Sequence, residues 1–222
     1  VLWESHSSDK GRTWTPGKPT TIATPHSRFF IRRLSSGNLL LVNHYKFTGR
    51  SHLTAQLSTD DGATWNEGLL LDERGGLNFP GGLPISYPDG AQDKDGLIWI
   101  TYDRDRGGVG EILLAKFKEE DVVAGKDVSG AVSLKQVVNK LNKPASAPKP
   151  AVKVTQELLN SIHVTPKLIF DPMPAYGQKY LPFAMAASME STSKGRLWTC
   201  WAGGQDGPNA YLIASYSDDQ GK

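Results

Sequence analysis

The sequence predicts an all-β protein built as a β-propeller, and three observations support this fold class. A turn motif recurs along the chain with a spacing of about 50 residues, which is typical of propeller blades. Short aromatic and aliphatic runs, bounded by turn residues, lie between the copies and predict strands. Glycine and proline make up 23 and 14 of the 222 residues, above average usage, and indicate many tight turns. We therefore expect four-stranded antiparallel blades.

The turn motif has the pattern Ser-x-Asp-x-Gly-x-Thr-Trp. It occupies residues 7–14 and 58–65, which begin 51 residues apart, and a third copy begins at Ser217, close to three such periods further on. We expect the Asp to cap backbone amides of an outer hairpin, the Gly to supply a positive φ, and the Trp to pack back onto the sheet. A structural role in the turn is favoured over a catalytic one for these residues.

Seven short runs are predicted as strands, since each is rich in apolar residues and bounded by Gly, Asp, Asn or Ser. Residues 119–125 and 133–141 instead have helical spacing. Residues 142–154, rich in Pro, Ala and Lys, indicate an extended linker. We place this linker at 144–166, between propeller parts at 1–143 and 167–222. The predicted strands are residues 29–33, 39–42, 53–57, 97–102, 112–117, 197–201 and 211–216.

Composition and charge exclude several classes of protein. Lys and Arg number 25 against 23 Asp and Glu, a net charge of +2, so binding to nucleic acid through phosphate neutralisation is not expected. The single cysteine, Cys200, excludes an internal disulfide and a cysteine-built zinc site. The five His show no metal-ligand spacing. No apolar run reaches the length of a membrane span, and we expect any signal peptide to be absent from this chain or already removed.

The repeated motif resembles the Asp box of the sialidase superfamily, whose members fold as six-bladed β-propellers. Residues 27–34, 86–90 and 98–104 are also similar to bacterial sialidase-like proteins of this group. By this resemblance, residues 1–143 correspond to the last blades of such a protein and residues 167–222 to its first blade, truncated. Because six blades of about 50 residues need roughly 300, we expect the chain to cover part of a ring. It is then a fragment, a rearranged product, or one of several chains that self-associate to complete the propeller.

The resemblance implies a retaining exo-α-sialidase that removes terminal sugars from glycoconjugates. Such enzymes use a Tyr nucleophile, because the anomeric carbon of sialic acid bears a carboxylate that would repel a second one. A Glu takes the phenol proton, an Asp acts as general acid and base, and three Arg bind the substrate carboxylate. No organic cofactor and no metal are required by this chemistry.

Two parts of this pattern match position by position. Arg50 precedes the second copy of the motif by eight residues, where the family has a carboxylate-binding Arg. Tyr87 precedes an Asp-Gly turn and a strand, which resembles the family's nucleophile, its Asp-Gly turn and its strand ending in Tyr-Glu. The strand here ends in Tyr-Asp, so Asp103 departs from the family at that position. Tyr87 and Asp103 are the catalytic candidates. The substrate-binding candidates are Arg50, Arg28, Asp89 and Arg104.

Other parts of the family's site have no match in the sequence. The first carboxylate-binding Arg would fall near Met185, where the chain has no Arg. The Glu and the second Arg would lie before Val1, and the acid/base Asp would follow the third copy of the motif. The missing Arg weakens the expectation of sialic-acid specificity, and another sugar is an open alternative.

Plainer interpretations stand beside these roles. Arg50 has a solvated strand position as its alternative, and Tyr87 precedes Pro88, which favours an extended backbone and simple packing at a turn. Arg104 and Arg106, with Asp103 and a neighbouring Asp, also fit a salt-bridged loop.

Two functions from different classes follow. The first is a secreted, periplasmic or cell-surface exo-glycosidase of the sialidase type. The second is a propeller that binds glycans or protein without chemistry, which needs only an aromatic, hydrogen-bonding pocket. In both cases the expected partner is a glycan or glycoconjugate, with no nucleic acid and no membrane span.

Overall fold

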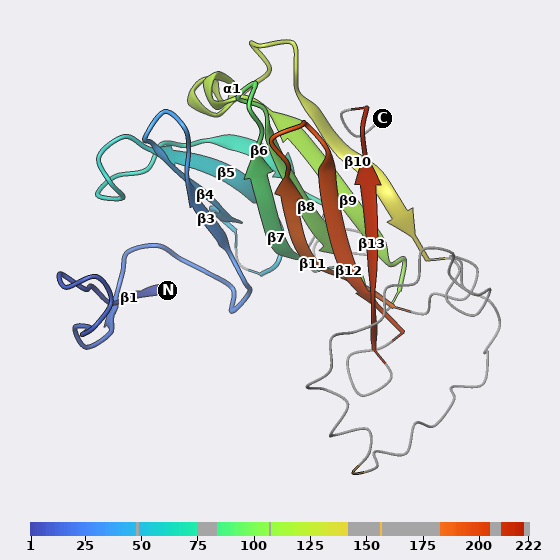
Figure 1. Ribbon diagram of the computed structural model, residues 1–222. Coiled ribbons are helices and arrows are strands. Elements are labelled where there is room, and N and C mark those ends of the chain that lie inside the picture. The colour runs from blue at the N-terminus through green and yellow to red at the C-terminus, as the bar shows by residue number, and fades with distance from the viewer. Residues whose placement is uncertain are drawn as a thin grey trace.

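The computed structural model describes residues 1–47, 49–74, 84–106, 108–141, 156, 183–204 and 210–219. These residues form an all-β structure of antiparallel sheets (Figure 1), each with its strands in sequence order. The first blade consists of β3 (Phe30–Arg33), β4 (Leu39–His44), β5 (Leu53–Ser58) and β6 (Leu69–Asp72). The central blade consists of β7 (Ile85–Gln92), β8 (Ile98–Arg104), β9 (Glu111–Phe117) and β10 (Ser133–Lys140). The predicted fold class, a propeller built from four-stranded blades, is confirmed.

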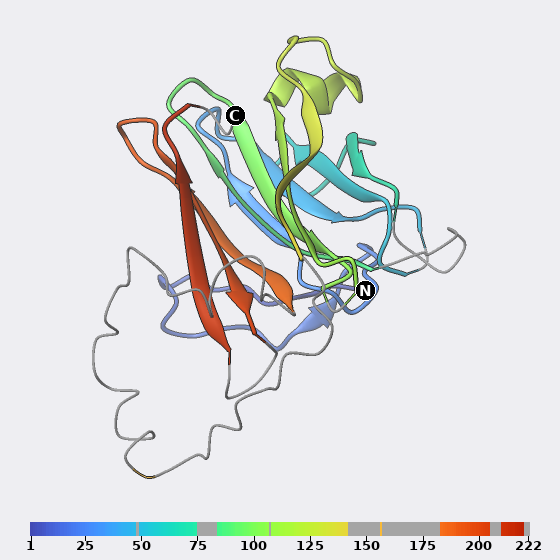
Figure 2. The same cartoon turned by 90° about the vertical axis from the view of Figure 1, so that its right-hand side faces the viewer.

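Two smaller sheets complete the described structure. The third blade consists of β11 (Ala184–Ser191), β12 (Leu197–Gly203) and β13 (Tyr211–Ser217), and a two-stranded sheet pairs β1 (Trp3–Glu4) with β2 (Lys18–Pro19). Figure 2 shows the first and third blades on opposite sides of the central blade. A single short helix in the described ranges, α1 (Glu119–Ala124), lies between β9 and β10.

The hydrophobic core lies between neighbouring blades, where apolar side chains from facing sheets meet. One cluster joins the first and central blades and includes Leu40, Val42, Ile100 and Phe117, which are almost completely buried. Two further clusters join the central blade to the third, around Trp99 and Trp201 among others. The central blade is therefore buried on both faces. Residues that alternate along β8 consequently enter two different interfaces.

The second repeat turn connects the two outer strands of the first blade, β5 and β6, as predicted, and the first connects β1 to β2. In the second copy Ser58 Oγ donates to Asp60 at 2.7 Å, and Asp60 accepts from the backbone and the hydroxyl of Thr64 at 2.8 and 2.6 Å. These bonds, the Thr64 hydroxyl foremost, lower the pKa of Asp60 to about 2. Trp65 is half-buried, but Trp14 of the first copy is 63% exposed. The expected packing of the Trp onto the sheet is therefore wrong for the first copy.

The prediction of a helix at residues 133–141 is wrong, whereas the one at 119–125 is confirmed as α1. Residues of β10 pair with β9 through two register shifts, one of them beside Lys135, which has φ 60°. A bulge shifts the side-chain alternation by one residue, which gives the apolar positions a spacing that resembles a helix. The linker predicted at 144–166 lies outside the described residues, apart from residue 156.

Candidate active site

The candidate site lies at one rim of the blades, at the ends opposite the repeat turns. The backbone of Arg50, between β4 and β5, accepts a hydrogen bond from Ile85 N at 3.0 Å, which joins the first blade to the start of β7. β8 ends at this rim, because Ile85 pairs with Arg104 and Ser86 pairs with Asp103. The rim therefore brings Arg50, Asp103 and the first half of β7 together, although the first two are 53 positions apart.

Tyr87 occupies a β-bulge in β7, between the paired residues Ser86 and Asp89. Its φ is 55°, in the left-handed region that bulky residues rarely adopt. The expectation that Pro88 holds Tyr87 extended is therefore wrong: the bulge forces a conformation that costs on the order of 1–3 kcal/mol. Proline fits here because a bulge does not need its missing N–H. Backbone strain of this kind is typical of functional sites.

Two guanidinium groups lie over the Tyr87 ring. The Cζ atom of Arg106 is 4.0 Å from the ring centroid, and that of Arg50 is 5.9 Å from it. Arg50 also donates to Ser86 Oγ at 3.2 Å and to the carbonyl oxygen of His26 at 3.1 Å. Both of these partners are neutral, so the positive charge of Arg50 is not neutralised through them.

Asp103 is completely buried on the face of β8 that meets the third blade. Its Oδ2 accepts a hydrogen bond from Ala186 N at 3.2 Å and lies 3.4 Å from Nη2 of Arg106. Its Oδ1 is buried with no hydrogen-bond partner among the described residues. Burial raises the pKa of Asp103 to about 7, against the opposing effect of Arg106 and the Ala186 amide. A carboxyl whose pKa is raised toward neutrality is suited to proton transfer, and Arg106, which lies over the Tyr87 ring, is the residue that contacts both groups.

Arg28 and Asp89 form an ion pair with each other at the inner edge of the blades. Asp89 Oδ1 also accepts from the amide of Gly90 at 2.8 Å. Arg28 comes from the segment before β3 and Asp89 from β7, so the pair joins the innermost strands of two blades. Arg28 and Asp89 therefore lie at the same rim as Tyr87, but each already has the other as its oppositely charged partner.

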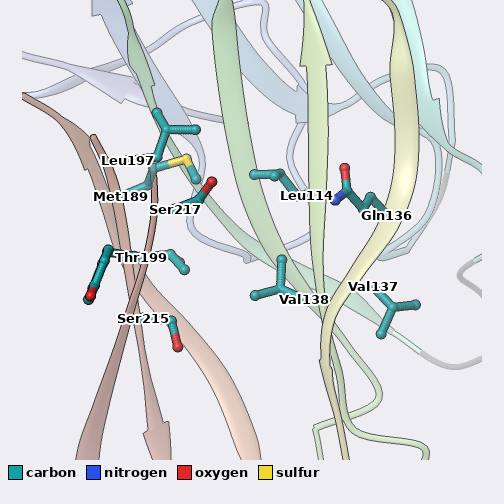
Figure 3. A pocket seen from close by; sticks show the side chains of 10 residues that line it. Leu114, Gln136, Val137, Val138, Met189, Leu197, Thr199, Ser215 and Ser217 are labelled. Carbon is teal, nitrogen blue, oxygen red and sulfur yellow. The ribbon is translucent and has the colours of Figure 1, made fainter. Parts of the chain in front are cut away.

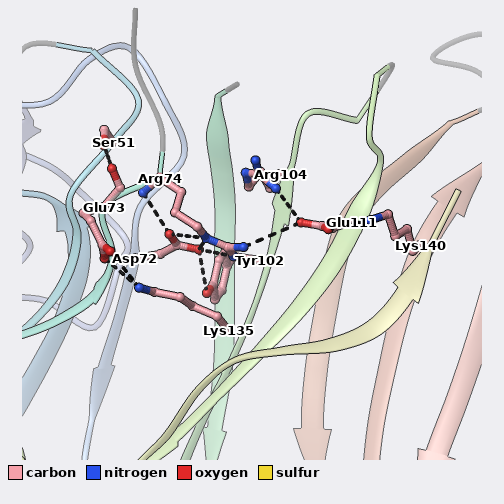
Figure 4. Close-up of polar contacts among 9 residues, drawn as sticks. All are labelled: Ser51, Asp72, Glu73, Arg74, Tyr102, Arg104, Glu111, Lys135 and Lys140. Carbon is pink, nitrogen blue, oxygen red and sulfur yellow. Dashed lines mark hydrogen bonds and ion pairs between the residues drawn. The ribbon is translucent and has the colours of Figure 1, made fainter. Parts of the chain in front are cut away.

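Arg104 is not brought together with Tyr87 and Asp103. It donates to Glu111 at 2.7 Å on the face of the central blade that meets the first blade. There it belongs to a network, shown in Figure 4, in which Arg74 binds Asp72 through two nitrogens and the Tyr102 hydroxyl donates to Asp72 at 3.1 Å. Successive residues of a strand point to opposite faces, which explains why neighbours in the sequence enter different clusters.

The sequence reasoning missed Arg106 as a member of the site. The Nη1 of Arg106 donates to the sulfur of Met185 at 3.2 Å, and its carbonyl oxygen accepts from Ala184 N. Met185 is the position near which the resemblance would place an Arg. A guanidinium thus reaches this place from the end of β8, rather than from β11. The signal in the sequence was the run of alternating Asp and Arg at 103–106, which had the salt-bridged loop as its expected role.

A cleft of about 230 Å³ lies elsewhere, between the outer strands of the central and third blades. Figure 3 shows it bordered by Leu114, Val138, Met189 and Leu197, with the hydroxyl groups of Ser215 and Ser217 at its side. It holds no carboxylate, His or cation in its lining. This cleft is therefore a gap in blade packing, and the chemistry-bearing side chains lie at the rim.

In the described part of the chain, no three His, Cys, Asp or Glu side chains converge as they would around a metal ion. No described helix is long and apolar enough to cross a membrane.

Comparison with known proteins identifies the N-terminal part of the chain. Residues 1–100 match the family model of the BNR repeat-like domain. The match covers β1 to β7 and the start of β8, including Arg50 and Tyr87, and it bears out the predicted resemblance to the sialidase superfamily. No curated protein sequence matches the chain.

Solved structures similar to this chain include several glycan-active enzymes. An alpha-L-arabinanase of Penicillium chrysogenum, complexed with arabinobiose, has a TM-score of 0.54 and 16% identity over 97% of this chain and 54% of that one. A Hadza microbial sialidase has a TM-score of 0.48 at 12% identity, over 88% of this chain and 36% of that one. An ulvan lyase has a TM-score of 0.47 at 16% identity, over 86% of this chain and 41% of that one. This chain thus spans about half the length of the arabinanase, whose likeness supports the propeller fold.

Proposed function

We propose that the chain belongs to a glycan-cleaving enzyme of the sialidase type, which removes an anionic terminal sugar at the rim. The observation that carries the proposal is Tyr87, held in a left-handed bulge with the guanidinium groups of Arg106 and Arg50 over its ring. Beside this group lies Asp103, a buried carboxyl whose pKa of about 7 is raised by burial. A nucleophile, a proton acceptor and cations are thereby contributed by four residues at one rim.

Tyr87 is the proposed nucleophile, and Asp103 is the proposed acceptor of its proton. A free phenol with a pKa of about 10 is a poor nucleophile at neutral pH, so attack on the anomeric carbon requires a base. Asp103 serves in its ionised form, directly or through one water. The bond from the Tyr87 oxygen to the anomeric carbon forms as the glycosidic C–O bond breaks, and the aglycone leaves as an oxyanion that takes up a proton from water. Water then attacks the anomeric carbon of the glycosyl-tyrosine, the bond to the Tyr87 oxygen breaks, and Asp103 returns its proton to the phenolate as the attacking water releases one to solvent.

Arg50 is the proposed binding group for the anionic substituent of the sugar. Its two hydrogen bonds go to a hydroxyl and a carbonyl oxygen, neither of them charged, so a carboxylate of the substrate gains a charge-assisted partner. Arg28 is less suited, because Asp89 already pairs with it. Sialic acid is the proposed sugar, and uronic acids are the anionic alternative.

A propeller that binds glycans without cleaving them is the second candidate. It is favoured by the shortage of carboxyl groups at the rim, since Asp89 is engaged with Arg28, and Asp103 is the described carboxyl with a buried, unpartnered oxygen. Retaining hydrolysis also needs an acid for the leaving group. A nitrophenolate leaving group does not need one, so aryl glycosides separate the two candidates.

The test is a panel of aryl glycosides, namely a sialoside, a glucuronide and neutral hexosides, assayed with the parent protein and with Tyr87→Phe. We expect cleavage of an anionic member, and a loss of at least about 100-fold in kcat for the variant, because the nucleophile is removed. Tyr45→Phe is the matched control, since the Tyr45 hydroxyl donates to Glu67 at 3.2 Å rather than to a residue of the proposed site. Equal rates for Tyr87→Phe and the parent would disprove the nucleophile. Binding of a glycan without any cleavage would establish the second candidate.

A further inference from the structure

Arg106 contacts the proposed nucleophile Tyr87, the proposed base Asp103 and the third blade. Its guanidinium lies 4.0 Å above the Tyr87 ring and 3.4 Å from Asp103 Oδ2, and it donates to Met185 of the third blade at 3.2 Å. Its side chain is 21% exposed, so these contacts hold it at the junction of the central and third blades. The resemblance to sialidases assigned no role to this position.

The hydrogen bonding between Arg106 and Asp103 is incomplete. Nη2 of Arg106 and Oδ1 of Asp103 are both buried, and neither has a hydrogen-bond partner in the described ranges. An unpartnered buried polar atom costs about 1–3 kcal/mol, so each such atom requires an explanation. The two groups are close enough for attraction between their charges, yet each keeps hydrogen-bonding capacity for a water or a substrate oxygen.

We infer that Arg106 is a positioning residue, which orients the Tyr87 ring by cation–π contact and favours the ionised form of Asp103 by charge. The Arg106 side chain then determines both the orientation of the nucleophile and the ionisation of its base. The inference rests on the proposed function for its catalytic meaning, whereas its electrostatic part concerns Asp103 alone. It differs from substrate binding, which is proposed for Arg50.

The charges around Asp103 make the effect of Arg106 specific. Burial is the largest influence on the pKa of Asp103 and raises it; Arg106 is the largest opposing influence, followed by the Ala186 amide and the more distant Arg50. The strands beside Asp103 present Ser86 on β7 and Ile112 on β9, which carry no charge. Without Arg106, burial is opposed by Arg50 and one amide, so the pKa of Asp103 must rise further.

The test measures the ionisation of Asp103 directly by a ¹³C NMR titration of labelled Asp carboxyl groups, with the resonance assigned by Asp103→Asn. We expect Arg106→Met to raise the titration midpoint by at least one pH unit, and Arg106→Lys to leave it near the parent value because the charge is kept. Arg33→Met is the matched control, since Arg33 is an exposed arginine that pairs with Asp61 at the opposite end. An unchanged midpoint in Arg106→Met would overturn the electrostatic part.

The pH profile of cleavage tests the positioning part. If Asp103 must be ionised, kcat/KM falls at acidic pH, and Arg106→Met should move this limb upward by the same amount as the NMR midpoint. Arg106→Lys should restore the limb but keep a kcat reduced at least about 10-fold, because a compact ammonium does not stack on the ring as a planar guanidinium does. Full kcat in Arg106→Lys would overturn the positioning role.

The two readouts separate this inference from the proposed function. If the NMR midpoint shifts and the parent cleaves no glycoside, the proposed function is wrong and the electrostatic inference holds. If the parent cleaves a glycoside and the NMR midpoint does not shift in Arg106→Met, the proposed function holds and the electrostatic inference is wrong. Should Arg106→Met fail to fold, Arg106→Gln, which also removes the charge, takes its place in the titration.

Discussion

The two faces of the central blade carry polar clusters of opposite character. On the face toward the first blade, each carboxylate has a cation: Asp72 has Arg74, and Glu111 has Arg104. On the face toward the third blade, buried Asp103 has only a loose pair with Arg106 and keeps one unpartnered oxygen among the described residues. Both clusters are buried and lie at the same rim, so burial alone does not distinguish them.

The difference between the faces lies in how completely the carboxylates are paired. On the first-blade face both oxygens of Asp72 and of Glu111 have a donor or a cation, although Arg104 Nε is buried without a partner among the described residues. Carboxylates paired in this way have little capacity left for a ligand, which suits a structural role. An unsaturated pair retains capacity that a substrate or water can use, and its ionisation is sensitive to its neighbours. We therefore assign stability to the first-blade face and chemistry to the third-blade face. The predictions below compare the two faces by changing one residue at a time.

The largest expected effect is the loss of Arg74, which would leave the fully buried Asp72 without its cation. Removing one partner of a buried pair costs about 3–5 kcal/mol, so Arg74→Met should lower the free energy of unfolding by that amount. Urea denaturation at pH 7 measures it. Arg106→Met is the comparison on the other face and should cost about 1 kcal/mol, because Asp103 readily takes up a proton at that pH. Equal losses in both variants would contradict the distinction.

Much of the fold could be predicted from the sequence because strand and turn signals are local. All seven predicted runs coincide with strands, and the second repeat turn connects β5 to β6. The short strands β1, β2 and β6 were missed. So were β7, which contains Pro88 and a bulge at Tyr87, and β11 (Ala184–Ser191), which is rich in small residues. β10 was mistaken for a helix because its bulges disturb the two-residue alternation. Irregular pairing, set by neighbouring strands, is not encoded in local spacing.

The site could be predicted in part, and the reason is strand alternation. Arg50, Tyr87 and Asp103 were named from their motif positions, and the rim brings them together. Arg104 was also named, yet it points to the opposite face from Asp103 and pairs with Glu111. Arg106 was missed as a site residue because its position beside Met185 depends on how the third blade packs against the central one. Contacts between blades are long-range, and single-sequence patterns do not contain them.

The second expected effect is a dependence of stability on pH that comes from Asp103. Its pKa is raised from 3.8 to about 7 in the folded state, so the native state keeps a proton that the unfolded state releases between these values. Stability must therefore fall as pH rises from about 4 to 7, by roughly 4 kcal/mol at 1.4 kcal/mol per pKa unit, and level off above 7. Denaturation of the parent and of Asp103→Asn across this range isolates the contribution.

His44 makes the comparison with Asp103→Asn necessary. Burial lowers the pKa of His44 to about 4, so the unfolded state takes up a proton below pH 6.5 that the native state does not, and His44 stabilises less as pH falls. The change of stability with pH that His44 causes is opposite in sign to that of Asp103, and it is present in both the parent and Asp103→Asn. A difference between parent and variant that does not change with pH would contradict the raised pKa of Asp103.

The third expected effect concerns the Tyr102 hydroxyl on the first-blade face. Tyr102 is completely buried and donates to Asp72 Oδ2 at 3.1 Å. A hydrogen bond to a charged group contributes about 1.5–3 kcal/mol, so Tyr102→Phe should cost about 2 kcal/mol in thermal or urea unfolding, with little effect on activity. Tyr87→Phe should show the reverse pattern, a large loss of activity with a stability change below about 0.5 kcal/mol. Identical behaviour of the two variants would remove the assignment of roles to the faces.

The smallest expected effect lies at the solvent edge of the first-blade network, where Lys135 donates to both carboxylate oxygens of Glu73 at 2.9 and 2.8 Å. Both side chains are about a third exposed, so Lys135→Met should cost at most about 1 kcal/mol and less in high salt.

Lys135 also has φ 60°, a conformation that costs a side-chain-bearing residue roughly 1–2 kcal/mol and glycine almost nothing. Lys135→Gly should therefore be more stable than Lys135→Met by about 1 kcal/mol, although both lose the ion pair. The ion pair lowers the pKa of Glu73, so its contribution is present above the unfolded value of about 4.5 and lost as pH falls below it. Urea denaturation of the parent and both variants at pH 7 and pH 3.5 separates the two terms. The difference between the two variants reports the backbone term and should persist at both pH values, whereas the loss of each variant relative to the parent should shrink at pH 3.5 as the ion pair weakens.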